Sequence, residues 1–182
     1  ATFPTNGIVL NSGLNVADGD ITMASGHGIN FAATSDAAAM AAELLDDYEE
    51  GTWTIGLVDT SANAITTDFN EGRYTKIGRQ VYVNVWVRAT SLGSASGNIS
   101  GTGLPFTVSN ANSAYAGNQC TYGTGLHLEN TSNGFACMAD KNATTLWFRH
   151  SDNDDGYNDQ LTAAQISANG SWMFQFTYTT DS

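Results

Sequence analysis

Positively charged residues are scarce in this sequence, and their scarcity excludes several classes of function. The 182 residues include six Lys and Arg against 18 Asp and Glu, which gives a formal net charge of −12. So few cations cannot neutralise a phosphate backbone, and we expect neither nucleic-acid binding nor attachment to an anionic membrane. No apolar run approaches the roughly 18 residues of a spanning helix, so no membrane insertion is expected.

The sequence also contains few cysteines and lacks the features of a signal peptide. The two cysteines, Cys120 and Cys137, are too few for a disulfide framework and form no CxxC motif. We interpret both as small core residues. The chain starts at Ala1 without the charged and apolar regions of a signal peptide, which favours a start inside a longer protein.

Gly, Ser, Thr and Asn are abundant instead, and these residues do not favour helices. Aromatic residues make up 10% of the chain, too many for a disordered protein. The composition therefore predicts an all-β fold, which we divide into three segments. Residues 1–34 carry short apolar pieces about seven residues apart, typical of a repetitive β-rich shaft. A floppy linker is the alternative for these residues.

The second segment, residues 35–50, combines alanines with an apolar stripe formed by Met40, Leu44 and Tyr48. It predicts a short acidic helical linker, with a solvated acidic hinge as the alternative.

The third segment, residues 51–182, alternates strands and turns. Arg79–Thr90 places Val at every second position, and Gly170–Thr180 does the same with aromatic residues. About eight strands at this spacing predict a jelly-roll-like β-sandwich tip. Within this tip we predict a hairpin, formed by Tyr115–Leu128 and Gly134–Ala139.

Several blocks resemble the C-terminal domain of bacteriophage tail fibre and tail spike proteins. They are ELLDDYEEGTWT at 43–54, GRYTKIGRQVYV at 72–83, Leu104–Phe106, and the linking segment Ala24–Phe31. The resemblance implies an appendage on the virion, assembled as an intertwined homotrimer and folded in the cytoplasm of the host bacterium. It implies a tip that contacts a polysaccharide or protein receptor on the host surface, without naming the receptor.

Three functions follow as hypotheses. The first is adhesion, in which three weak sites on one axis gain strength by multivalency. The second is a structural trimerisation or capping module of the fibre without its own ligand. The third is a fragment of a depolymerase. We expect no enzymatic activity, because no nucleophile elbow or other catalytic motif is present.

Candidate binding residues lie opposite the apolar faces of two strands. An aromatic ring beside a fixed set of hydrogen-bond donors suits a sugar ring and its hydroxyl groups. The candidates for a glycan site are Tyr82, Trp86, Arg88, Trp147 and Arg149. The same residue types are enriched at subunit interfaces, and ordinary packing is a third possibility.

An acidic loop at 151–159 is the candidate metal site, because calcium prefers several hard oxygen ligands around a turn. Its carboxylates are Asp152, Asp154, Asp155 and Asp159. The spacing does not match an EF-hand, and a solvated turn is the alternative. Calcium is the only cofactor that the sequence brings into consideration.

Overall fold

The computed structural model describes residues 14–25, 27–30, 44–45, 47–128, 134–152 and 156–181. The contacts divide the chain into two units, Ala1–Asp46 and Asp47–Ser182. Within the described ranges, no helix is long and apolar enough to cross a membrane.

The first unit has little regular structure where it is described. Residues 14–25 form no strand, and their apolar side chains are exposed, with Leu14 at 64% and Ile21 at 56%. One antiparallel contact joins β1 (Ile29–Asn30) to β2 (Leu44–Leu45). Of the described apolar pieces predicted to build a shaft, only the one at Ile29 has a neighbouring strand within a single copy, whereas those in residues 14–25 have none.

The helix predicted over residues 35–50 is wrong for the part that the structure describes. Residues 35–43 and 46 lie outside the described residues, whereas Leu44–Leu45 is strand and β3 (Tyr48–Thr54) is another. β3 pairs with β6 (Glu71–Ile77) along its whole length. The stabilisation that all seven residues of β3 gain by pairing in the sheet exceeds an intrinsic helix preference of a few tenths of a kcal/mol per residue.

The acids of this segment fit the two-residue period of a strand. Tyr48 and Glu50 share one face, where the Tyr48 hydroxyl donates to Glu50 Oε2 at 3.0 Å. Glu49 lies on the other face and accepts a hydrogen bond from the hydroxyl of Tyr74. Asp47, just before β3, forms an ion pair with the buried Lys76.

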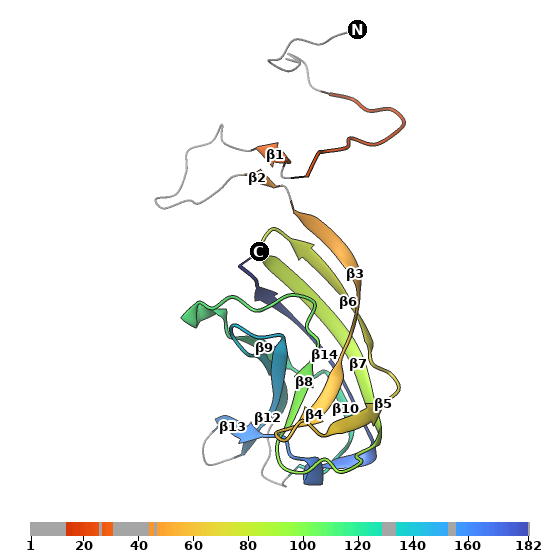
Figure 1. The fold of residues 1–182 in the computed structure, drawn as a ribbon, viewed down its shortest axis with the longest axis vertical. Helices are drawn as coiled ribbons and strands as arrows, with labels where there is room; N and C mark the ends of the chain where they lie inside the picture. The colour runs from red at the N-terminus through yellow and green to blue at the C-terminus, as the bar shows by residue number, and fades with distance from the viewer. Residues whose placement is uncertain are drawn as a thin grey trace. The chain divides into compact units, whose positions relative to one another are not determined.

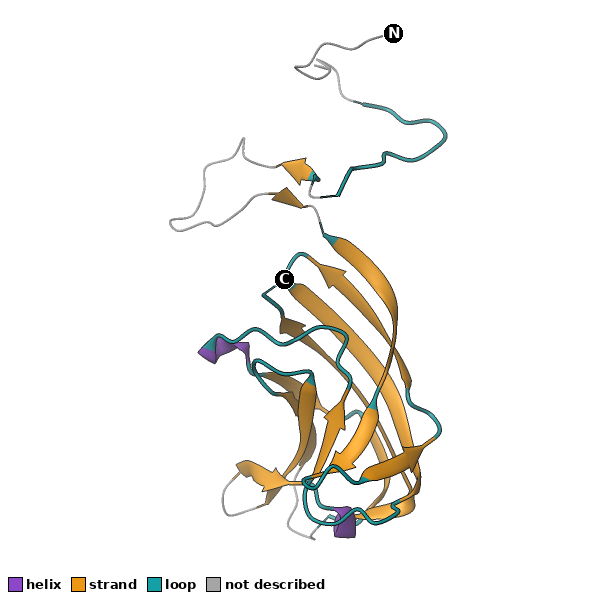
Figure 2. Ribbon diagram, viewed as in Figure 1, coloured by secondary structure: helices purple, strands orange, loops and turns teal. Residues whose placement is uncertain are grey.

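The second unit is an antiparallel sheet that curls into a sandwich, which confirms the predicted all-β, jelly-roll-like class (Figures 1 and 2). The described residues contain no α-helix, only the 3₁₀ turns η1 (Asn112–Ala114) and η2 (Ala163–Gln165). One layer, called the β7 sheet, has the order β3, β6, β7 (Gln80–Ser91), β14 (Ile166–Thr179), β10 (Tyr122–Leu126).

The other layer, called the β12 sheet, has the order β5 (Ala64–Thr67), β4 (Gly56–Asp59), β8 (Ile99–Thr102), β12 (Thr145–Asp152), β11 (Gly134–Ala139), β9 (Ala116–Gln119). β13 (Gly156–Gln160) also pairs with β12. β5 pairs with both β4 and β7 and so joins the two layers.

The core lies between the two layers and is built from strands with a strict two-residue alternation. Val81, Val83, Val85 and Val87 of β7 are buried, as predicted. The aromatic residues of β14 also point inward as predicted, namely Trp172, Phe174, Phe176 and Tyr178. Each such side chain contributes about 1.5–3 kcal/mol by burial, so these two strands hold the sandwich together.

Two glycines in the sequence blocks that resemble tail fibre proteins allow an aromatic side chain to lie directly against the backbone. A Cβ on Gly72 would lie 2.4 Å from Nε1 of Trp53 and 2.3 Å from the carbonyl oxygen of Asn84. The Trp53 indole occupies that space and donates to this carbonyl oxygen at 3.3 Å. Likewise, a Cβ on Gly51 would lie 2.9 Å from the ring of Tyr74. The glycines and aromatics of these blocks therefore form complementary pairs in the sheet.

The Asp59 carboxylate links two loops at one end of the sandwich by hydrogen bonds. Its side chain is 3% exposed, and its carboxylate accepts hydrogen bonds from the backbone N–H groups of Ser61, Asn63 and Ser96, each at 2.8 Å. The Asn63 side-chain amide donates a further bond at 2.9 Å. The Asn63 amide and these backbone donors lower the pKa of Asp59 from 3.8 to about 2.

This carboxylate predicts a loss of stability in acid. Because its folded pKa is lowered, the stabilisation is complete above about pH 4 and disappears as the pH falls through about 2. We expect the Tm difference between the natural protein and Asp59→Asn to be largest above about pH 4 and to shrink towards pH 2. Thermal unfolding by circular dichroism measures it, with Glu71→Gln as a charge-matched control. A Tm difference that is constant across this range would contradict the prediction.

Candidate functional site

The five predicted binding residues lie on two opposite faces of the sandwich. Tyr82, Trp86 and Arg88 alternate with the buried valines of β7, so they lie on the outer face of the β7 sheet. Trp147 and Arg149 alternate with buried residues of β12 and lie on the outer face of the β12 sheet. The structure therefore does not bring the two groups together, because their strands belong to different layers.

On the β7 face, the chain's own residues hold Trp86 and Arg88. The Trp86 ring stacks on Phe69, with centroids 4.4 Å apart, and its indole N–H donates to Ser171 Oγ at 2.5 Å. The Arg88 guanidinium lies 4.2 Å from the centre of the Phe69 ring and forms an ion pair with Asp68. Its hydrogen bonds lower the pKa of Asp68. Nevertheless, Trp86 and Phe69 remain 38% and 42% exposed.

The rest of the β7 face is shallow. Tyr82 is 38% exposed, and its hydroxyl donates to Gln175 Oε1 at 2.8 Å. Beside it, a depression of about 300 Å³ lies between β6, β7 and β14, with Arg73, Asn84 and Trp86 among its lining residues. Tyr122 of β10 adds another aromatic side chain that is 44% exposed. This face is broad and aromatic, and its depression is less than half the volume of the hollow described below.

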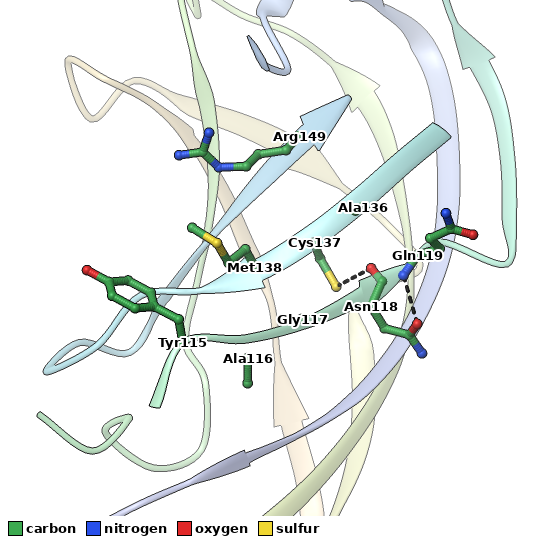
Figure 3. Close-up of a pocket in the computed structure, with 9 residues that line it drawn as sticks. All are labelled: Tyr115, Ala116, Gly117, Asn118, Gln119, Ala136, Cys137, Met138 and Arg149. Carbon is green, nitrogen blue, oxygen red and sulfur yellow. Dashed lines mark hydrogen bonds between the residues drawn. The ribbon is translucent and has the colours of Figure 1, made fainter. Parts of the chain in front are cut away.

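The β12 face contains a larger hollow of about 650 Å³, formed by β9, β11 and β12 (Figure 3). Strand register places Met138 beside Trp147, and Ala136 between Arg149 and Gln119. Figure 3 shows the side chains of Tyr115, Met138 and Arg149 extending to the same side. The residues that line the hollow are Tyr115, Ala116, Gly117, Asn118, Gln119, Ala136, Cys137, Met138 and Arg149.

Small residues between larger ones explain why the surface is hollow here. Ala136 and Gly117 contribute almost no side-chain volume between the larger Met138, Arg149 and Tyr115. Gly117 is required by packing, because a Cβ there would lie 2.2 Å from the carbonyl oxygen of Cys137. The close approach of β9 to β11 therefore leaves space above the sheet.

The chemistry of the hollow is apolar with donors at its edge. Tyr115 is 45% exposed, and the Arg149 guanidinium lies 5.0 Å from the centre of the Trp147 ring. Gln119 and Asn118 add amide groups to the lining. Lys141 stands near the edge, with Nζ 5.8 Å from the centre of the Tyr115 ring. An apolar floor with amide, hydroxyl and guanidinium groups matches the two sides of a sugar ring.

The sequence missed most of this hollow because the predicted hairpin is only partly correct. β9 pairs with β11, as predicted, but the chain leaves the layer after Gln119 and β10 pairs with β14 instead. Tyr115–Leu128 is therefore two strands in two layers. The glycine at 117 beside the aromatic Tyr115 is the one local signal of a close strand approach.

The cysteines lie at this crossover. Cys137 is buried, which confirms its interpretation as a core residue, and Cys120 is half-buried and packs against the core. Both thiols are free. A hydrogen bond with Cys137, together with burial, raises the pKa of Cys120. Cys120 therefore stays protonated at neutral pH and is a poor nucleophile.

The acidic loop remains a prediction. Asp154 and Asp155 lie outside the described residues, as does the side chain of Asp152. Asp159 is exposed on β13 and opposes the buried His150 in the strand register. Among the residues that the structure describes, no three His, Cys, Asp or Glu side chains gather closely enough to hold a metal ion.

The comparisons with known proteins identify the fold. Neither a family model nor a curated protein matches the chain. The structure is similar to part of the crystal structure of Dettilon tailspike protein, with a TM-score of 0.60 and 15% sequence identity. The similarity covers 72% of this chain and 24% of that one. The chain therefore has a fold found in one part of a tail spike protein.

Proposed function

We propose that this chain is a distal part of a phage tail fibre or tail spike and binds a glycan on the host surface. The hollow between β9, β11 and β12 carries the proposal, because it joins an apolar floor to several hydrogen-bond donors. Its volume of about 650 Å³ lies within the range of small-molecule sites. The fold similarity to a tail spike protein supports the location in the virion tail.

Each side of a sugar has a partner in the hollow. The apolar face of a pyranose ring packs on Tyr115 and Met138, while its hydroxyl groups bond to Gln119 and Arg149. Met138, Gln119 and Arg149 stand on paired strands and Tyr115 directly precedes β9, so little ordering is needed when the ligand binds. The site would bind without cleaving, and we expect the polysaccharide to keep its length.

Weak single sites fit a homotrimer, which we include in the proposal. The exposed apolar residues of the first unit, such as Leu14 and Ile21, would be covered by neighbouring copies. Three hollows on one particle then raise the avidity by orders of magnitude without stronger individual contacts.

A structural capping module is the second candidate function, and the β7 face favours it. Large aromatic surfaces are exposed on this face, which suits a subunit contact better than a small ligand, and they belong to Phe69, Trp86 and Tyr122. In our proposal this face contacts another copy, and the β12 face contacts the receptor.

Filling the hollow should remove binding while the protein stays folded. Ala136→Phe places a ring over the floor of the hollow without deleting a polar group, and we expect at least about a tenfold loss of affinity. Binding of fluorescent protein to bacteria and to a panel of surface polysaccharides measures the loss, with light scattering and Tm as checks of assembly.

Trp86→Ala is the matched variant on the opposite face. We expect it to weaken the trimer and to leave the affinity of each site for a short oligosaccharide unchanged. If Trp86→Ala abolished binding with the trimer and Tm intact, while Ala136→Phe bound normally, the receptor site would lie on the β7 face. If no glycan bound but the trimer formed, the capping function would be favoured.

A further inference from the structure

The two cysteines are distant in the sequence but neighbours in the fold. Cys137 opposes Asn118 where β11 pairs with β9, and the backbone N–H of Cys120 donates to the carbonyl oxygen of Phe135 at 2.8 Å. Cys120 is therefore the diagonal neighbour of Cys137 on the paired chain, and residues in this relation share one face of a sheet. Accordingly, Cys137 is buried and Cys120 packs against the same core.

The two thiols act on each other. Both are free, and a hydrogen bond between their side chains raises the pKa of Cys120 and lowers the pKa of Cys137. Cys137 Sγ also lies 3.5 Å from the carbonyl oxygen of Asn118. Cys137 is thus the sulfur of the pair that more readily becomes a thiolate, while Cys120 keeps its proton beside it.

Cys120 stands where the chain can complete the approach to Cys137. Diagonal neighbours have Cα atoms about 7–8 Å apart, whereas a disulfide spans about 4.4–6.8 Å. Cys120 directly follows β9, at the point where the chain leaves the β12 sheet for β10 of the other layer. Because the ends of elements open more easily than their centres, this strand end supplies the small movement that a disulfide needs.

From this juxtaposition we infer that Cys120 and Cys137 are an oxidation site, at which hydrogen peroxide closes one intrachain disulfide. The Cys137 sulfur attacks one oxygen of the peroxide, the O–O bond breaks, and hydroxide leaves and takes the proton that Cys137 lost. The Cys120 sulfur then attacks the sulfenic acid at the Cys137 sulfur, the S–O bond breaks, and the departing hydroxide takes the Cys120 proton. Two thiols are oxidised, one peroxide is reduced, and two water molecules form.

The bond would join β11 to the crossover between the layers. It closes a loop of about 18 residues that contains β10, and closing such a loop restricts the unfolded chain and so stabilises the native fold. A protein of this kind folds with free thiols and becomes crosslinked later, in oxidising surroundings. The inference does not depend on the proposed glycan binding.

Treatment of the full chain with dilute hydrogen peroxide tests the inference. We expect both thiols to disappear together when they are titrated in denaturant, and a non-reducing digest to contain a peptide crosslinked between Cys120 and Cys137. The Tm should rise by about 5–10 °C. Dithiothreitol should reverse both changes, which separates them from methionine sulfoxide, because a sulfoxide needs its own reductase.

Serine variants separate the roles of the two sulfurs. Cys120→Ser should stop at the sulfenic acid of Cys137, which dimedone traps, and its Tm should not rise. Cys137→Ser lacks the attacking sulfur and should keep its Cys120 thiol under the same treatment. The inference would be overturned if the natural protein kept both thiols while folded, if disulfides formed only between different chains, or if the reversible rise in Tm also occurred in Cys120→Ser.

Discussion

Trp172→Ala should cost about 3–5 kcal/mol of the free energy of unfolding. The Trp172 side chain is fully buried on β14, and its ring packs edge-on against Phe135 and Phe148, with centroids 6.0 and 5.1 Å away. These three rings come from both layers of the sandwich. Removing the central ring leaves a cavity that rigid, paired strands cannot close.

Trp172→Phe is the matched control. Among the described residues, the indole N–H of Trp172 finds no hydrogen-bond partner, so its removal deletes no bond and leaves a smaller cavity. We expect the control to cost less than half as much as Trp172→Ala. Chemical denaturation at fixed protein concentration measures both. Similar losses for the two variants would mean that a phenyl ring fills this site no better than a methyl group, which would contradict the cavity argument.

Gly72→Ala should also destabilise strongly, by about 3 kcal/mol, although it adds only one methyl group. The new Cβ would lie 2.3 Å from the backbone oxygen of Asn84, which belongs to the paired strand β7 and cannot move independently. The Trp53 indole, 2.4 Å away, would have to shift and lose its bond to the same oxygen.

Gly123→Ala provides the comparison in β10, another strand of the same sheet. There the new Cβ meets only the end of the Leu126 side chain, at 3.0 Å, and that side chain can rotate away. We expect a change within about 1 kcal/mol. Equal losses at Gly72 and Gly123 would mean that the backbone contact at Gly72 is relaxed elsewhere in the sheet.

Long strands with one buried face were predictable because their pattern repeats many times. β7 shows Val at every second position, and β14 shows aromatic residues in the same way, so both strands and their inner faces follow from sequence alone. The segment around Tyr48 was not predictable in this way. Its alanines and apolar stripe favour a helix locally, and only pairing with distant β6 makes it a strand.

The candidate site was half predictable. Trp147 and Arg149 are visible in the sequence because they alternate with core residues of one strand. The hollow beside them depends on β9, which reaches its place through a crossover after Gln119 and a glycine at 117. Tyr115, directly before β9, and Met138 of β11 come from other parts of the chain, and no local pattern fixes which strands will be neighbours.

Methionine methyl NMR tests the central claim most directly, because the two opposite faces each carry one methionine. Met138 lines the hollow on the β12 face, and Met173 lines the depression on the β7 face. When an oligosaccharide from a bound host polysaccharide is added, the account predicts that the methyl signal of Met138 shifts in a saturable way and that of Met173 does not. A shift of Met173 alone, or saturable binding that moves neither signal, would contradict it.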